Sequence, residues 1–195
     1  REAWHTGSFW LIVSAFFLMS VSVHGCLIHL VPMLTDRGVS AQSAALATSL
    51  LGGALLVGRV GAGYLLDLFF ASHVAVCFLC AAALGIFLLW SGVVGGLAFG
   101  AAILLGLGLG GETDFMPYLV SRYFGLRAFG EIYGYILASW GLGGVIGPLV
   151  MGIGFDATGS YRLVLAVFVV TTLAAAGLMS RLGPYRVWQA AAEPA

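Results

Sequence analysis

Charge is what this sequence lacks most. It contains no lysine, and charged residues occupy only 8% of its 195 positions, whereas a soluble domain usually has about 25%. The eight basic and eight acidic residues cancel, so there is no positive excess that would indicate nucleic-acid binding. With so little charge available for its surface, the chain is not expected to be a soluble globular domain.

Cysteine is also scarce, which argues against a disulfide framework. The three cysteines are Cys26, Cys77 and Cys80, and all lie in apolar runs. Cys77 and Cys80 form a C-x-x-C pair, but in a helix this spacing places two small apolar side chains on one face. HExxH, GxSxG and paired-aspartate helix motifs are missing, so the sequence predicts no enzyme, no metal site and no cofactor.

Long apolar runs are abundant, because 61% of the residues are hydrophobic. About 20 apolar residues in a helix cross the roughly 30 Å of hydrocarbon in a bilayer. Six runs meet this requirement, at residues 8–33, 41–66, 74–90, 93–119, 128–153 and 163–179. They predict an all-α membrane protein, a single six-transmembrane-helix bundle, followed by a cytoplasmic tail at residues 181–195.

The arginines between the runs predict the orientation. Five lie on the same side as the N-terminus, namely Arg1, Arg122, Arg127, Arg181 and Arg186. Two lie on the other side, Arg37 and Arg162. Because cytoplasmic loops are richer in arginine, we expect both ends of the chain in the cytoplasm. A bacterial inner membrane is a separate expectation. The chain starts with arginine rather than methionine, which suggests a piece of a longer polypeptide.

The fourth and fifth runs are rich in glycine, in GLGLGG at 106–111 and GLGGVIG at 141–147. Small residues at such spacing let helix backbones approach closely. One interpretation is close packing alone. The other is a helix pair that slides or bends.

Arg59 lies inside the second apolar run, where a charge costs about 2.5 kcal/mol or more on insertion. At 1.5 Å per residue it is about 12 Å from Asp67, at the end of the run. A guanidinium matches the geometry of a carboxylate. Arg59 is therefore predicted to contact a substrate carboxylate, or alternatively to brace the bundle by pairing with Glu112 or Asp114.

Glu112 and Asp114 in the fourth run, and His29 in the first, are candidates for proton coupling. The two acids are two positions apart, so they point to roughly opposite sides of a helix. Asp114 shares a stripe with Tyr118 and Arg122, which favours a local structural brace. A histidine can carry protons at physiological pH, but His29 is alternatively a packing or gating residue.

Charged and aromatic residues near the ends of the runs suggest a gate and a cavity wall. Four charged residues are predicted at the cytoplasmic side, Asp67, Arg122, Arg127 and Glu131. They are candidates for an ion-pair latch on an inner gate, or are solvated loop charges. Trp140 and Tyr133 are candidates for the aromatic wall of a substrate cavity, with helix packing as the alternative.

Four segments in order carry a resemblance to a known family. They are HLVPMLTDRGVSAQSAA at 29–45, GRVGAGYLLD at 58–67, GGETDFMPYLVSRYFG at 110–125 and GLGGVIGPLVMGIGFDATGSYR at 141–162. The chain resembles the C-terminal six-helix half of a major facilitator superfamily transporter, and within it the monocarboxylate porter and oxalate:formate antiporter group. The resemblance implies a 3+3 inverted repeat that forms one half of a twelve-helix fold.

The same resemblance implies a function. It suggests secondary active transport of a small organic anion, a monocarboxylate, by alternating access, as symport or antiport, with an N-terminal six-helix half as partner. Arg59 matches an arginine of the eighth helix that binds the substrate carboxylate in that group. Leu55 stands where proton-coupled porters have aspartate, and Trp140 where oxalate:formate antiporters have lysine. The alternatives are an exporter of hydrophobic or drug-like compounds and a non-transporting membrane scaffold.

Overall fold

The computed structural model describes residues 3–185, and within that range it is all-helical. A single turn of 3-10 helix at Ala3–His5 precedes six α-helices. These are α1 (Gly7–Asp36), α2 (Ala41–Leu68), α3 (Ala71–Trp90), α4 (Gly96–Phe124), α5 (Phe129–Thr158) and α6 (Arg162–Ser180). All six are long and apolar enough to cross a membrane. The predicted fold class, an all-α bundle of six membrane-spanning helices, is confirmed.

Each helix overlaps one of the predicted apolar runs, and the differences lie at the ends. The fourth run begins at residue 93, but α4 begins only at Gly96. Gly92 and Gly95 adopt φ values of 83° and 63°, which belong to a region that glycine reaches without steric penalty and that ends a right-handed helix. The tail beyond residue 185, including Arg186, lies outside the described residues, as does Arg1.

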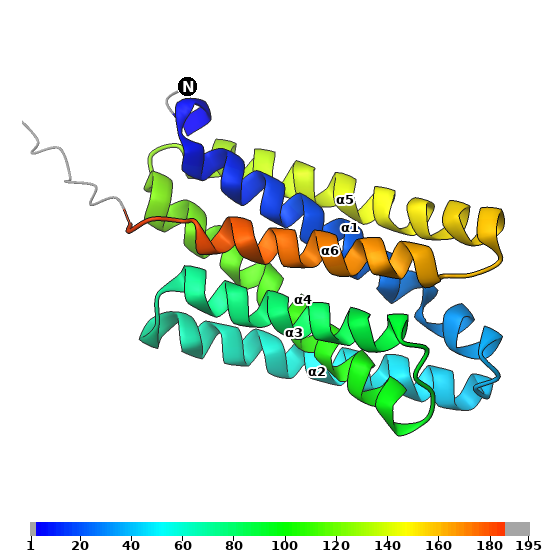
Figure 1. Cartoon of the computed structure of the whole chain (residues 1–195). Helices are drawn as coiled ribbons and strands as arrows, with labels where there is room; N and C mark the ends of the chain where they lie inside the picture. The colour runs from blue at the N-terminus through cyan, green and yellow to red at the C-terminus, as the bar shows by residue number, and fades with distance from the viewer. Residues whose placement is uncertain (1–2, 186–195) are drawn as a thin grey trace, which may run out of the picture.

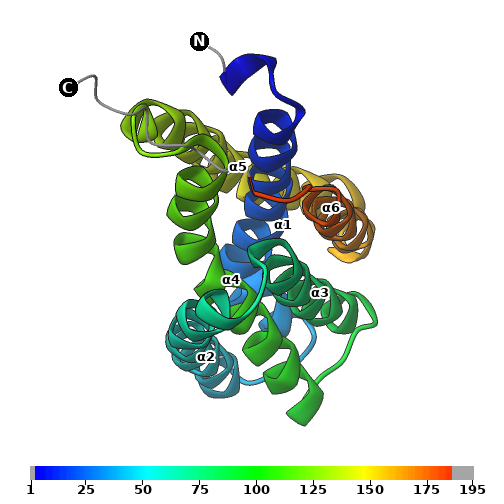
Figure 2. The same cartoon turned by 90° about the vertical axis from the view of Figure 1, so that its left-hand side faces the viewer.

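The helices pack in a pattern that repeats after three helices. α2 packs mainly on α4, and α1 mainly on α5. α3 lies against α4 and α6, and α1 also lies against α6. Exchange of α1 with α4, α2 with α5 and α3 with α6 leaves this set of contacts unchanged. The internal repeat explains why α1, α5 and α6 form one group and α2, α3 and α4 the other (Figures 1 and 2).

The two main helix pairs are in contact through their backbones at glycines. A Cβ atom on Gly110 of α4 would lie 2.3 Å from the carbonyl oxygen of Leu55 in α2, and one on Gly147 of α5 would lie 2.0 Å from that of Val21 in α1. Only glycine permits this approach. The close-packing interpretation of the glycine runs therefore agrees with the structure at these positions.

α2 and α5 are the most open helices of the bundle. Of the most apolar stretch in each, 22% of the residues are buried, against 56% in α1 and in α4. The bundle thus has a well-packed centre, in which α1 and α4 lie, and two helices whose outer faces have no neighbour among residues 3–185. α4 contacts both α2 and α5, so residues of α4 can reach either one.

Candidate functional site

Glu112 and Asp114 of α4 face different neighbours. Glu112 Oε1 accepts a hydrogen bond from the indole Nε1 of Trp140 in α5. Asp114 Oδ1 lies 3.7 Å from Nε of Arg59 in α2. The prediction that the two acids point to different sides of the helix is confirmed, and these sides face α5 and α2.

The Glu112 carboxyl is buried deep in the bundle. The residue is 1% exposed, and its Oε2 atom has no hydrogen-bond partner within the described part of the chain. Its neighbours along α4 on the same side, Phe115 and Met116, are buried and apolar. A carboxylate anion held there without a cation is expensive, so the Trp140 indole is the group that orients this side chain.

Trp140 connects Glu112 to α1 through Ser20 and His24, neither of which was predicted as a site residue from the sequence. The hydroxyl of Ser20 donates to the Trp140 carbonyl oxygen over 2.7 Å and lies 3.2 Å from Nδ1 of His24. The His24 ring meets the Trp140 ring edge-on, with centroids 5.1 Å apart. Ser20, His24, Trp140 and Glu112 thus form a polar chain from α1 through α5 to α4.

Arg59 and Asp114 form a loose and partly open ion pair. Their side chains are 58% and 30% exposed. The separation of 3.7 Å exceeds the usual length of a hydrogen bond. The pair lies beside a close backbone contact between α2 and α4, since a Cβ atom on Gly110 would lie 2.8 Å from the backbone nitrogen of Arg59. Of the two acids predicted as partners for Arg59, the structure places Asp114 beside it.

Arg122 is held by aromatic rings rather than by Asp114. Its Nη2 donates to the Tyr118 hydroxyl over 3.3 Å, and its guanidinium lies 5.1 Å from the centroid of the Tyr118 ring and 5.8 Å from that of Tyr185. The expected brace of Asp114, Tyr118 and Arg122 is present only in its Tyr118–Arg122 part, because Asp114 turns toward α2.

The four candidate gate residues are exposed in this structure. They are Asp67, Arg122, Arg127 and Glu131. Across residues 3–185, the ion pair found is that of Arg59 with Asp114, and none joins these four. A latch among them stays a prediction.

The remaining candidates lie apart from the two acids. Tyr133 stacks on Phe129 with ring centroids 5.6 Å apart. His29 contacts the carbonyl oxygen of Gly25 through Nδ1 at 3.2 Å and lies 6.0 Å from the ring of Tyr161. Of the two predicted aromatic residues, only Trp140 contacts one of the acids, Glu112, among the described residues. In the part of the chain that the structure describes, no group of three or more His, Cys, Asp or Glu side chains is placed to hold a metal.

The sequence is similar to a known family, and the fold is similar to known structures. The family model described as Major Facilitator Superfamily matches residues 10–193. Among solved structures, the E. coli fucose:proton symporter matches with a TM-score of 0.73 and 19% identity, over 93% of this chain and 45% of that one. An auto-inhibited POT family peptide transporter matches with a TM-score of 0.78 and 13% identity, over 94% and 39%. No curated protein matches.

These matches define the fold and the family. At such identities the two structures show a shared fold and nothing finer, and the chain spans less than half the length of each. The family model covers nearly the whole chain and does not distinguish the monocarboxylate and oxalate subgroup. Together with six helices long and apolar enough to span a bilayer, it shows that this integral membrane protein belongs to the major facilitator superfamily.

Proposed function

We propose that the chain is the C-terminal half of a secondary active transporter, which carries a small organic anion, a monocarboxylate, by alternating access. The observation that carries this proposal is the Arg59–Asp114 pair between α2 and α4, away from the ends of both helices. Arg59 is the group that binds the substrate carboxylate. Trp140 and Tyr133 belong to the aromatic wall of the path.

The position of the pair supports an aqueous cavity beside it. Arg59 is 58% exposed, on a helix of which only 22% of the most apolar stretch is buried. A guanidinium facing lipid at this depth is costly, whereas one facing a water-filled path is not. An N-terminal half of the same transporter would close this cavity from the other side. The length of the two solved transporters, more than twice that of this chain, supports such a half.

The geometry of the pair supports exchange of one carboxylate for another. Asp114 approaches Arg59 through Nε, and the half-exposed side chain leaves the two Nη groups for a ligand. Guanidinium binds a carboxylate best through two parallel hydrogen bonds. A substrate carboxylate would therefore replace the loose contact with Asp114 by a closer one, at little net electrostatic cost, because an exposed ion pair stabilises by only about 0–1 kcal/mol.

Replacement of Asp114 by the substrate also provides coupling to protons. Once Arg59 binds the substrate, Asp114 is left without its cation, and a proton on Asp114 restores neutrality. Glu112 is the second candidate proton carrier, because a buried carboxyl without a cation favours its uncharged form. His29 is a third candidate, at the opposite end of α1 from the N-terminus. The net result is one proton moved with one monocarboxylate.

The ends of the bundle supply the gate in this proposal. Asp67, Arg122, Arg127 and Glu131 lie on the side of the described termini, which we assign to the cytoplasm of a bacterial cell. They pair in the outward-open state and separate in the inward-open state. The exposed state of all four in the structure fits the separated arrangement.

The test is uptake by the full-length protein in proteoliposomes, with and without an imposed proton gradient. Labelled lactate, pyruvate and formate are the anionic probes, and lactamide is the uncharged control. Arg59→Ala should abolish uptake of the anions, while Arg181→Gln, an exposed arginine at the end of α6, should leave it unchanged. Normal anion uptake by Arg59→Ala would refute the proposal.

Two other outcomes would identify the alternatives. Transport of many hydrophobic compounds that is insensitive to Arg59→Ala would indicate an exporter. The Arg59–Asp114 pair has zero net charge, which is also compatible with uncharged substrates. A correctly inserted protein that moves none of these compounds would indicate a non-transporting scaffold.

A further inference from the structure

A cavity lies at the end of the bundle that is farthest from the termini. Three connections meet there, α1–α2, α3–α4 and α5–α6 (Figure 1). The cavity has a volume of about 310 Å³, and its lining includes Met33, Arg37, Trp90, Tyr161 and Arg162. This volume is at the lower end of the range of about 300–1,000 Å³ for small-molecule sites. It is separate from Arg59, Asp114 and Glu112, none of which lines it.

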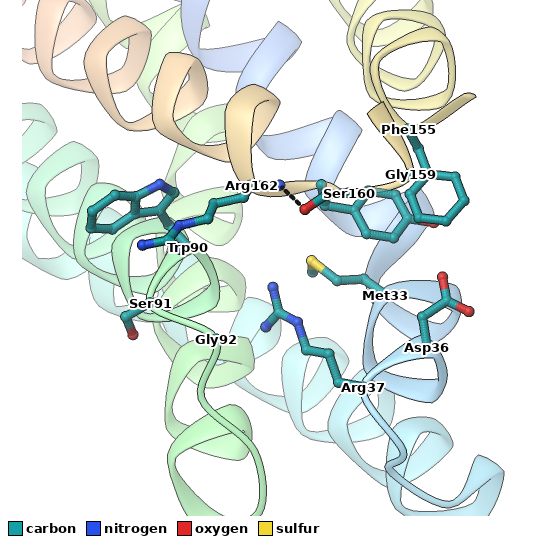
Figure 3. Close-up of a pocket in the computed structure, with 11 residues that line it drawn as sticks. Met33, Asp36, Arg37, Trp90, Ser91, Gly92, Phe155, Gly159, Ser160 and Arg162 are labelled. Carbon is teal, nitrogen blue, oxygen red and sulfur yellow. Dashed lines mark hydrogen bonds between the residues drawn. The ribbon is translucent and has the colours of Figure 1, made fainter. Parts of the chain in front are cut away.

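Both arginines that the sequence places on this side of the membrane line the cavity. Arg162 is the first residue of α6, and its guanidinium lies 5.5 Å from the centroid of the Trp90 ring. Arg37 follows α1, and its Nη2 donates to the Leu89 carbonyl oxygen over 2.7 Å. Figure 3 shows Arg37 reaching up into the cavity from below and Arg162 extending along Trp90. The two cations thus come from separate elements.

Arg37 is incompletely satisfied. Its Nη1 atom is buried, and no group within residues 3–185 accepts a hydrogen bond from it. Burial also lowers the pKa of this guanidinium, since low-dielectric surroundings disfavour its charge. A buried charged donor without an acceptor costs more than a neutral one, so an acceptor in the cavity would stabilise the site.

The acidic residues nearby do not neutralise the two arginines. Asp36 lines the cavity, but its side chain points away from the Arg37 guanidinium in Figure 3. Over the described residues it forms no ion pair with Arg37 or Arg162. The pKa of Tyr161 is raised by burial first, and then by Asp36 and Asp156. The two acids are therefore near Tyr161, whereas the two guanidinium groups are near Trp90 and Leu89.

We propose that this cavity binds a phosphate group, held between Arg37 and Arg162. The donors come from two directions, which suits a tetrahedral oxyanion with several oxygens better than a planar carboxylate. Arginine is the residue best suited to phosphate, through its fixed fork of N–H groups. The phosphate belongs either to a phospholipid headgroup or to a free phosphate ion. The cavity lies at the ends of the spans, beside Trp90 and Tyr161, where headgroups and interfacial aromatic residues meet.

The lipid source is tested by native mass spectrometry of the full-length protein in detergent. The probes are phosphatidylglycerol and a galactosyl diacylglycerol, which has the same acyl chains and no phosphate. Wild type should retain phosphatidylglycerol about tenfold more strongly than the galactolipid, because a hydrogen bond to a charged group is worth about that factor. Arg162→Gln should remove most of this preference. Arg181→Gln is the matched control, an exposed arginine at the other end of α6.

The free-ion source is tested with inorganic phosphate against chloride at equal ionic strength, through the melting temperature of the same variants. A rise in melting temperature with phosphate that is lost in Arg162→Gln and kept in Arg181→Gln supports a soluble phosphate as ligand. Arg37→Gln should act in the same direction. Because it also removes the bond to Leu89, the conclusion rests on Arg162→Gln, whose side chain is exposed. If neither probe distinguishes Arg162→Gln from Arg181→Gln, the proposal is wrong.

Discussion

Glu112 and Asp114 are separated by one residue and occupy opposite environments. Glu112 is almost completely buried, faces α5 and accepts its hydrogen bond from a neutral indole. Asp114 is partly exposed, faces α2 and lies beside a cation. One carboxyl is therefore enclosed in the bundle, and the other is partly open to its surroundings. The comparison shows that α4 places its two acids in different environments, which its position between α2 and α5 allows.

The internal repeat sharpens this contrast. α2–α4 and α5–α1 are equivalent helix pairs, and both approach through glycines. The first pair contains Arg59 and Asp114, whereas the second contains Trp140, Ser20 and His24, joined by hydrogen bonds and ring contact. The same packing thus presents charges on one side and neutral polar groups on the other.

The largest loss of stability is expected from a substitution that forces α4 and α2 apart. In Gly110→Ala the new Cβ would lie 2.3 Å from the Leu55 carbonyl oxygen, so α2 must move away from α4. We expect a loss of about 3 kcal/mol in the free energy of unfolding, measured in mixed micelles. The Arg59–Asp114 pair should be lost, and the Trp140–Glu112 bond kept. Gly134→Ala is the control, because nothing lies within 4 Å of its Cβ position. Equal stability of the two variants would contradict the close contact.

A smaller effect is expected on the buried side. Trp140→Phe removes the indole donor to Glu112, and leaves a buried carboxyl with neither oxygen bonded. This should destabilise the protein by about 2 kcal/mol. In a Glu112→Leu background the same substitution should cost clearly less, which a double-mutant cycle measures. An identical cost in both backgrounds would mean that ring packing, and not the hydrogen bond, is what Trp140 contributes.

The smallest effect on stability is expected on the open side. Asp114→Asn should change the free energy of unfolding by less than about 1 kcal/mol, because partly exposed ion pairs contribute little. At the same time it should abolish the stimulation of anion uptake by a proton gradient. A loss of stability as large as that of Trp140→Phe, with uptake unaffected, would favour the structural brace over the exchange site.

The sequence was sufficient to predict the six helices, because the length of an apolar run is a local property of the chain. Six apolar runs gave six helices, and the cost of a charge in the membrane drew attention to Arg59. Which acid lies beside Arg59 depends on how α4 is rotated against α2, and that rotation is set by the glycine contacts between them. Glu112 and Asp114 were therefore equal candidates until the structure distinguished them.

Other parts of the sites come from contacts between distant segments. Ser20 and His24 reach Trp140 from α1, 120 positions away in the case of the Ser20 bond, and no local pattern in the sequence connects them. Arg37 and Arg162, which line the cavity at the other end of the bundle, were recognised only as topology signals. Their convergence depends on three connections that meet at one end of the bundle.

The central claim is that Arg59 exchanges Asp114 for a substrate carboxylate. Direct binding of labelled lactate to the full-length protein in detergent tests it, with wild type, Asp114→Asn and Arg59→Gln compared at one pH. Removal of the competing carboxylate should tighten binding in Asp114→Asn by up to about fivefold, and Arg59→Gln should bind no lactate. Unchanged or weaker binding by Asp114→Asn, together with wild-type binding by Arg59→Gln, would contradict the claim.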